Sequence, residues 1–132
     1  MISNTRNMDL VNSILCMPEI WKDIAPEGVE YFDSPYMPEL IYHLVNECDG
    51  VIIYHGFRDG LKIHPNIIKA KRGKDTFRAI EQSIQMVLKD CNVVYAEIDR
   101  ELRHVTWLAR QLKFSLLERG SRDLYVRRKL DA

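Results

Sequence analysis

The sequence predicts an α/β protein, and two observations indicate this class. Apolar residues recur at three- and four-residue steps in some segments, which is typical of helices packed on a core. Other segments are rich in β-branched and aromatic residues and are separated by Asp-Gly turn signals, which is typical of strands. The chain has 132 residues, no repeat and no composition shift, so we expect one domain over residues 1–132.

The elements follow from these patterns in order. We expect helices at 8–16 and 18–28, a packed loop at 29–38, strands at 40–47, 51–57 and 61–64, a long helix, a strand at 92–97, a helix at 102–112, and strands at 114–117 and 124–126. The turns Cys48-Asp49-Gly50 and Arg58-Asp59-Gly60 join the first three strands into an antiparallel meander. The alternation and charge of 123–130 are typical of a protected edge strand, which makes a homodimer possible.

Residues 63–90 are the stretch around which the rest is organised. A strand ends at His64-Pro65, because proline cannot donate a hydrogen bond within a sheet. A basic loop follows and leads into the long helix, whose N-cap is expected at Asp75 or Thr76. Backbone N–H groups at a helix start favour anions, so the basic loop has the outline of a phosphate site. A solvated basic surface is the alternative.

Composition sets the expected environment. The chain contains no apolar run of membrane-spanning length and no signal-peptide core at its start. The three cysteines have no metal-ligand spacing and are expected to be reduced structural thiols, so we expect no metal site. These features predict a soluble cytoplasmic protein that contacts no membrane.

The zero net charge hides an asymmetry between the two halves. Residues 1–60 hold three Lys/Arg and ten Asp/Glu, whereas residues 61–132 hold sixteen and nine. The halves either attract each other or steer ligands of opposite charge to different surfaces. A pI of about 6.9 argues against a dedicated nucleic-acid binder.

The element order, the basic loop and the later segment ending in Leu112-Lys113-Phe114 resemble the GNAT superfamily of acetyl-CoA-dependent N-acetyltransferases. The resemblance covers the chain from about Leu40 to its end. It implies a central, mixed but mostly antiparallel sheet with helices on both faces. It also implies that acetyl-CoA is held through its pyrophosphate by the loop Arg72-Gly73-Lys74-Asp75-Thr76-Phe77.

More narrowly, the His-Pro strand end, the Arg-Gly-Lys loop and the Arg-x-Leu-x-Phe ending at Arg110 to Phe114 look like small GNAT-like proteins of short-tailed bacteriophages. Those proteins are associated with head morphogenesis or internal virion proteins. This resemblance implies phage structural or internal virion proteins as partners, and the host cytoplasm as location.

The sequence differs from the family pattern at two functional positions, the pyrophosphate loop and the general acid. Asp75 and Phe77 replace the glycine or small residues of the pyrophosphate loop, and a carboxylate about 5 Å from a phosphate costs roughly 1–3 kcal/mol. The family's general-acid tyrosine corresponds to Ala109, which cannot transfer a proton. The departures imply that acetyl-CoA binding is weakened or lost.

A general base is still available in the sequence. Glu97 follows the short strand where the sheet of the family splays apart, and His64 ends a neighbouring strand close to the cofactor loop. A histidine titrates near neutral pH and suits proton transfer from an amine. Glu97 and His64 are the two candidates, while His43 and His104 are expected to be surface or packing residues.

Two functions fit these observations. In the first, the chain is a GNAT-fold phage protein with degenerate cofactor and catalytic motifs that acts in head or virion morphogenesis through protein contacts. In the second, it is an active N-acetyltransferase that acts on an amine acceptor drawn in by the acidic N-terminal half. Asp75, Phe77 and Ala109 favour the first function, whereas Arg72, Gly73 and Lys74 favour the second.

Overall fold

A computed structural model describes the chain except residues 25–26, 30–32, 69–72 and 130–132. Seven strands form one sheet in the order β1-β2-β3-β4-β5-β7-β6. All neighbouring strands are antiparallel except β4 and β5, which are parallel. The prediction of a mixed, mostly antiparallel sheet is therefore confirmed.

The elements follow the predicted order with one addition at the start. They are β1 (Ile2–Asn4), α1 (Met8–Leu15), α2 (Pro18–Ile24), β2 (Ile41–Val45), β3 (Gly50–Phe57), β4 (Gly60–Ile67), α3 (Lys74–Leu88), β5 (Val93–Ile98), α4 (Arg103–Gln111), β6 (Ser115–Glu118) and β7 (Asp123–Arg128). The sequence analysis missed β1. This strand has three residues and no pattern of its own, and it is held by pairing with β2.

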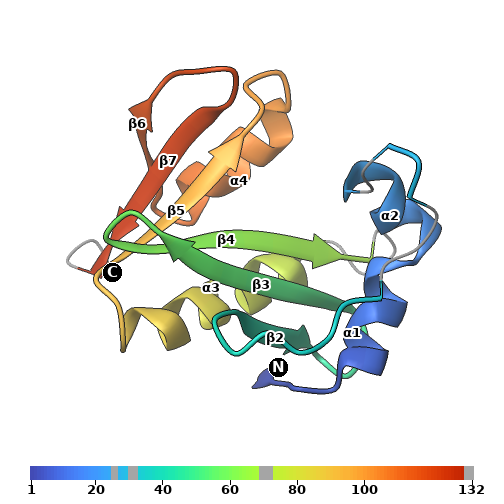
Figure 1. The fold of residues 1–132 in the computed structure, drawn as a ribbon. Helices are drawn as coiled ribbons and strands as arrows, with labels where there is room; N and C mark the ends of the chain where they lie inside the picture. Colours follow the sequence, from blue (N-terminus) through green and yellow to red (C-terminus); the bar gives the residue numbers. More distant parts are fainter. Residues whose placement is uncertain (25–26, 30–32, 69–72, 130–132) are drawn as a thin grey trace.

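Helices cover both faces of the sheet, as expected (Figure 1). The α1 and α2 helices pack on one face through a core that includes Val11, Ile14 and Ile20 together with Val51 of β3. The α3 and α4 helices pack on the other face, where residues such as Ile84 meet the opposite side chains of the strands. No described helix is both long enough and apolar enough to cross a membrane.

Pro65 does not end its strand, contrary to the prediction. It pairs with Ile52 inside β4, which continues to Ile67. The N–H of Ile68 donates to the carbonyl of Asp49 at 2.9 Å. Because hydrogen-bonded and non-hydrogen-bonded pairs alternate along an antiparallel ladder, the nitrogen of Pro65 faces away from β3. The missing N–H is therefore tolerated within this strand.

β7 is not an edge strand, which corrects a second expectation. It lies between β5 and β6, and β6 is at the edge of the sheet. Arg127 of β7 has a side chain that is 0% exposed and forms two hydrogen bonds to the carboxylate of Glu81 on α3, at 2.6 and 3.2 Å. Arg127, one of the charged residues that suggested an exposed edge strand, is thus buried beneath α3 in an ion pair with Glu81.

A chain of three buried polar groups joins α3 to the sheet. The hydroxyl of Ser83 lies 2.7 Å from Nδ1 of His43 on β2 and 2.8 Å from the hydroxyl of Tyr54 on β3. All three residues are at most 2% exposed. Burial lowers the pKa of His43, so this imidazole is neutral at pH 7.

We expect Ser83→Ala to lower the free energy of unfolding by about 2 kcal/mol, because it leaves two buried polar groups unpaired. Chemical denaturation at pH 7 measures this change. Ser13→Ala is the matched control, since Ser13 is exposed and bonds only to a backbone carbonyl of its own helix, that of Leu10. Equal effects of the two substitutions would show that the buried chain of hydrogen bonds contributes nothing.

Candidate active site

The central opening of the fold is a split between the two parallel strands. β4 and β5 pair only at Leu61–Val94 and Lys62–Tyr95. Beyond these pairs the strands diverge, and the β5–β7–β6 arm with α4 separates from the rest of the sheet (Figure 1). Past this point each strand has no strand partner across the split, so its edge can hydrogen-bond an extended ligand. Pro65 removes one donor from that edge of β4.

Two cavities meet at the split from opposite faces of the sheet. One lies on the side of α3 and α4, has a volume of about 110 Å³, and is lined almost entirely by apolar side chains, Ala109 and Phe114 among them. The other lies on the side of α1 and α2 and has a volume of about 460 Å³. Ile63, Pro65 and Glu97 line both cavities. A ligand on one side can therefore meet a ligand on the other through the split.

The α3 helix contributes Ile80 to the α3–α4 cavity. The N-cap that the sequence predicted for this helix was wrong. The N-cap is Gly73, with φ 144° and ψ −147°, and the helix begins at Lys74. Asp75 lies in the first turn of α3, where its side chain is exposed. Its helical backbone does not require a glycine at this position. Thr76 is buried, and its hydroxyl accepts a hydrogen bond from the N–H of Gly73 at 3.1 Å. One backbone donor of the anion site is thus already used.

The remaining predicted cofactor residues differ in what the structure shows. Phe77 is partly buried and packs against the main core, so it supports the helix. Arg72 lies outside the described residues, as do Lys69 and Lys71, and only the backbone of Lys74 is described. The described part of the predicted anion site is therefore the helix start itself, where the positive end of the helix dipole favours an anion.

Gly73 occupies a backbone conformation that is almost restricted to glycine. Among the described residues, no heavy atom outside the chain neighbours of Gly73 lies within 4 Å of an added Cβ, so backbone strain rather than a clash would oppose a side chain. We expect Gly73→Ala to lower the free energy of unfolding by about 1–3 kcal/mol. Gly56→Ala is the control because its added Cβ is equally free and no positive φ is present. Urea unfolding measures both variants. A similar loss of stability in the two would show that backbone strain at residue 73 is not the cause.

The end of α4 places a lysine in the left-handed backbone region. Lys113, directly after the C-cap Leu112, has φ 66°. The N–H of Phe114 donates to the carbonyl of Ala109 at 3.0 Å, and that of Lys113 donates to Arg110, also at 3.0 Å. This hydrogen-bond pattern is a Schellman motif, in which glycine is usual at the left-handed position.

No tyrosine is among the residues that line the α3–α4 side of the split. Ala109, at the position of the general acid, is buried and lines this cavity. Trp107 is 62% exposed, and Tyr125 is buried. Within the described residues, the protein thus offers no hydroxyl in this cavity for protonating a leaving thiolate.

The two candidate bases both line the α1–α2 cavity, but their surroundings differ. Glu97 forms a salt bridge with Lys62, and hydrogen bonding by this lysine holds the pKa of the carboxyl below its usual range. His64 stacks on the imidazole of His55 with ring centroids 4.8 Å apart. The His64 side chain is exposed, but partial desolvation by neighbouring groups, followed by the charges of His55 and Lys62, lowers its pKa from 6.5. His64 is therefore neutral at pH 7 and able to accept a proton.

Comparisons with solved structures agree with this architecture. The chain matches an aminoglycoside N(6′)-acetyltransferase from Legionella pneumophila with a TM-score of 0.74 at 12% identity, covering 99% of this chain and 92% of that one. It matches a spermidine N-acetyltransferase chimera from Vibrio cholerae and hSSAT with a TM-score of 0.72 at 10% identity, covering 98% and 97%.

A third match is the N-acetyltransferase PseH of Campylobacter jejuni in complex with acetyl coenzyme A, with a TM-score of 0.68 at 10% identity, covering 97% and 99%. No protein-family model and no curated protein matches the sequence. The chain therefore has the GNAT fold, as the sequence indicated. Nothing in these matches points to bacteriophage proteins.

Proposed function

We propose that this protein is an N-acetyltransferase that binds acetyl-CoA weakly and transfers the acetyl group to an amine. The observation that carries the proposal is the split between β4 and β5, which joins a cavity on each face of the sheet. Acetyl-CoA enters from the α3–α4 side, with its pyrophosphate at the N-terminus of α3. The amine enters from the α1–α2 side, where His64 lies.

The proposed reaction is direct acyl transfer. The amine nitrogen attacks the thioester carbonyl carbon, so that a C–N bond forms and the C–S bond breaks. A ring nitrogen of His64 takes the proton that the amine loses. The CoA thiolate takes a proton from water, because Ala109 supplies none. This last feature makes the protein slower than an enzyme with a positioned general acid.

Asp75 accounts for the weak binding in this proposal. Its carboxylate lies in the first turn of α3, where a phosphate would bind. We expect Asp75→Gly to tighten acetyl-CoA binding about ten- to hundredfold by removing a repulsion of roughly 1–3 kcal/mol. Calorimetry at low and moderate salt measures both dissociation constants. Asp90→Gly at the other end of α3 is the control, and an unchanged affinity for Asp75→Gly would contradict this role for the loop.

The second candidate is the assembly role, in which a degenerate GNAT-fold phage protein acts in head or virion morphogenesis. One specific observation favours a protein contact of this kind. The edge strand β6 exposes two successive leucines, Leu116 at 37% and Leu117 at 39%. An exposed apolar edge strand is a ready site for pairing with another chain, either a second copy or a virion protein. Absence of acetyl-CoA binding at millimolar concentration would favour this candidate.

A further inference from the structure

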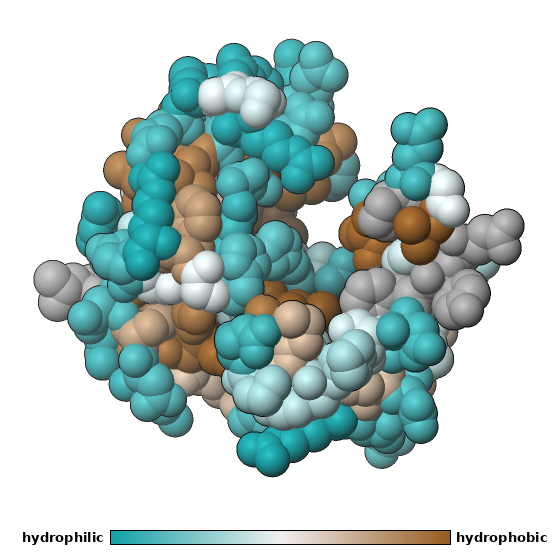
Figure 2. Space-filling model, in the orientation of Figure 1, coloured by the Kyte–Doolittle hydropathy of each residue, from teal (hydrophilic) through white to brown (hydrophobic). Residues whose placement is uncertain are grey.

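The residues that line the α1–α2 cavity indicate which chemical class of amine it could accept. Two walls are formed by different parts of the chain: α2 with Val29 on one side, and residues of β3, β4 and β5 on the other. The opening is visible as a hollow between the two arms of the molecule, with hydrophobic side chains on the α2 side (Figure 2). A volume of about 460 Å³ lies within the range of small-molecule sites.

The walls of this cavity are apolar. Trp21 and Ile24 come from α2, Val29 follows it, and Leu15 and Ile53 complete the surface. Ile24 and Val29 are 42% and 44% exposed, which is unusual for large aliphatic side chains. No charged side chain from α2 lines the cavity, although the helix carries Glu19 and Asp23. An apolar ligand would therefore gain by covering these walls.

The polar side of the cavity has almost no net charge. It consists of His64, Asn66 and Glu97. Among the described lining residues Glu97 is the one carboxylate, and its charge is balanced by Lys62. His64 is neutral at pH 7. A ligand with several ammonium groups would find no second carboxylate among the described lining residues, whereas a single amine that leaves its proton in solvent and binds to His64 as the neutral base leaves no charge unmatched.

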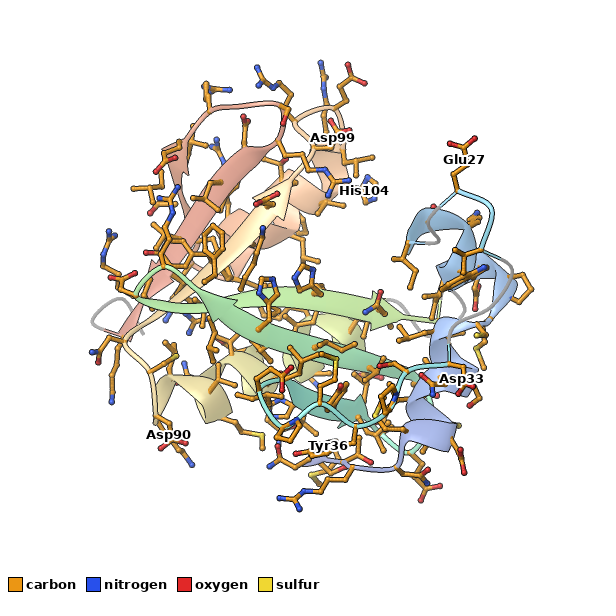
Figure 3. All side chains as sticks on the ribbon, in the orientation of Figure 1. Glu27, Asp33, Tyr36, Asp90, Asp99 and His104 are labelled. Atoms are coloured by element: carbon orange, nitrogen blue, oxygen red, sulfur yellow. The ribbon has the colours of Figure 1, made fainter. Side chains whose placement is uncertain are left out.

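Acidic residues do occur at the mouth, outside the cavity. Figure 3 shows Glu27 beyond the end of α2, on one side of the opening, with Asp99 and His104 at the tip of the β5–α4 arm on the other. Glu27 contributes to the field that attracts a cation from solution, since residues 1–60 are strongly acidic. The acidic side chains at the mouth do not pair with groups inside the cavity.

We propose that the acceptor is a monoamine on a compact apolar body, such as an aromatic ring joined to the amine by a short chain. The apolar body lies between Trp21 and Ile53, and the amine lies at His64. This inference rests on the proposed function, because it assigns the acceptor of that same site. Polyamines and peptide N-termini are the competing acceptor classes.

The chain offers a direct spectroscopic test, because it has two tryptophans, Trp21 and Trp107. In Trp107→Phe, Trp21 is the only tryptophan and lies in the cavity wall. We expect 2-phenylethylamine to change its emission, with a dissociation constant at least tenfold lower than that of spermidine or of an alanine-initiated tetrapeptide. The titrations are made with and without saturating CoA. Tighter or equal binding of spermidine or the peptide would overturn the proposal, as would an unchanged emission.

A pair of variants ties the binding to the apolar wall. Ile24→Asp, made in the Trp107→Phe protein, should weaken phenylethylamine binding at least tenfold. Leu117→Asp is the matched control, because it places the same charge at an exposed aliphatic residue that lies outside the cavity. Equal weakening in both variants would overturn the assignment. Acetyl-CoA binding is measured separately by calorimetry, so failure of the cofactor site is distinguished from failure of the acceptor assignment.

Discussion

Replacing Glu81 with alanine is expected to lower the free energy of unfolding by about 3–5 kcal/mol. The side chain of Arg127 is fully buried, and Glu81 is its carboxylate partner. One further hydrogen bond joins the guanidinium to the carbonyl of Leu112 at 3.0 Å. Without Glu81 the buried positive charge has no counter-ion, and the cost of such a charge exceeds the loss of a typical surface pair. Urea or thermal unfolding at pH 7 measures the change.

The chain contains a matched exposed pair for comparison. Arg58 and Glu118 form the same two-point contact, at 2.5 and 3.0 Å, with side chains that are 44% and 51% exposed. We expect Glu118→Ala to have a much smaller effect on stability than Glu81→Ala, because solvent screens an exposed ion pair. A double variant, Glu81→Leu with Arg127→Met, should recover most of the lost stability because it removes both charges. Similar costs for Glu81→Ala and Glu118→Ala would contradict the burial of Arg127.

His64→Gln is expected to lower acetyl transfer about a hundredfold or more while leaving acetyl-CoA affinity unchanged. Glutamine keeps the polarity of the side chain but cannot accept a proton. In the unaltered protein the rate should fall with decreasing pH at a value below 6.5, because protonated His64 is inactive and its pKa is lowered. Above that pH the imidazole is neutral, so His64 imposes no further pH dependence there. A pH profile of kcat/KM measures the inflection.

His55→Gln is the control for this prediction. It removes the stacked ring and the neighbouring charge, so the acid inflection should move towards 6.5 while turnover is largely kept. Glu97→Gln tests the other candidate base. If it abolishes turnover while His64→Gln does not, Glu97 is the base despite its salt bridge with Lys62. Loss of acetyl-CoA binding in either variant would indicate a structural role.

The fold was predictable because local patterns and global topology agree. Helical spacing of residues such as Ile80 and Ile84 marked α3, and Asp-Gly turns marked the meander. The predictions were wrong at residues whose structure depends on parts of the chain that are distant in the sequence. Pro65 fits inside β4 because its nitrogen faces the split, and Arg127 fits inside β7 because Glu81 lies above it. Neither partner is adjacent in the sequence.

The candidate site was predictable only in part for the same reason. His64 and Glu97 were predicted to be strand-end residues, whereas they lie within β4 and β5. The pairing of Glu97 with Lys62 depends on the contact of β5 with β4. The apolar walls from α2 were missed, because a short amphipathic helix does not indicate which side chains remain uncovered. One sequence feature could have indicated this wall: Trp21 and Ile24 lie three residues apart on α2 and therefore share one face of the helix.

The most direct test of the central claim is an amide NMR titration of the protein with acetyl-CoA. We expect shift changes at the N–H groups of residues 73–76 and along the diverging edges of β4 and β5, at Ile67 and Glu97. The amides of α1 and of β1 should not move. No changes at millimolar acetyl-CoA, or changes confined to a surface away from the split, would contradict the assignment of this opening as an acetyl-CoA site.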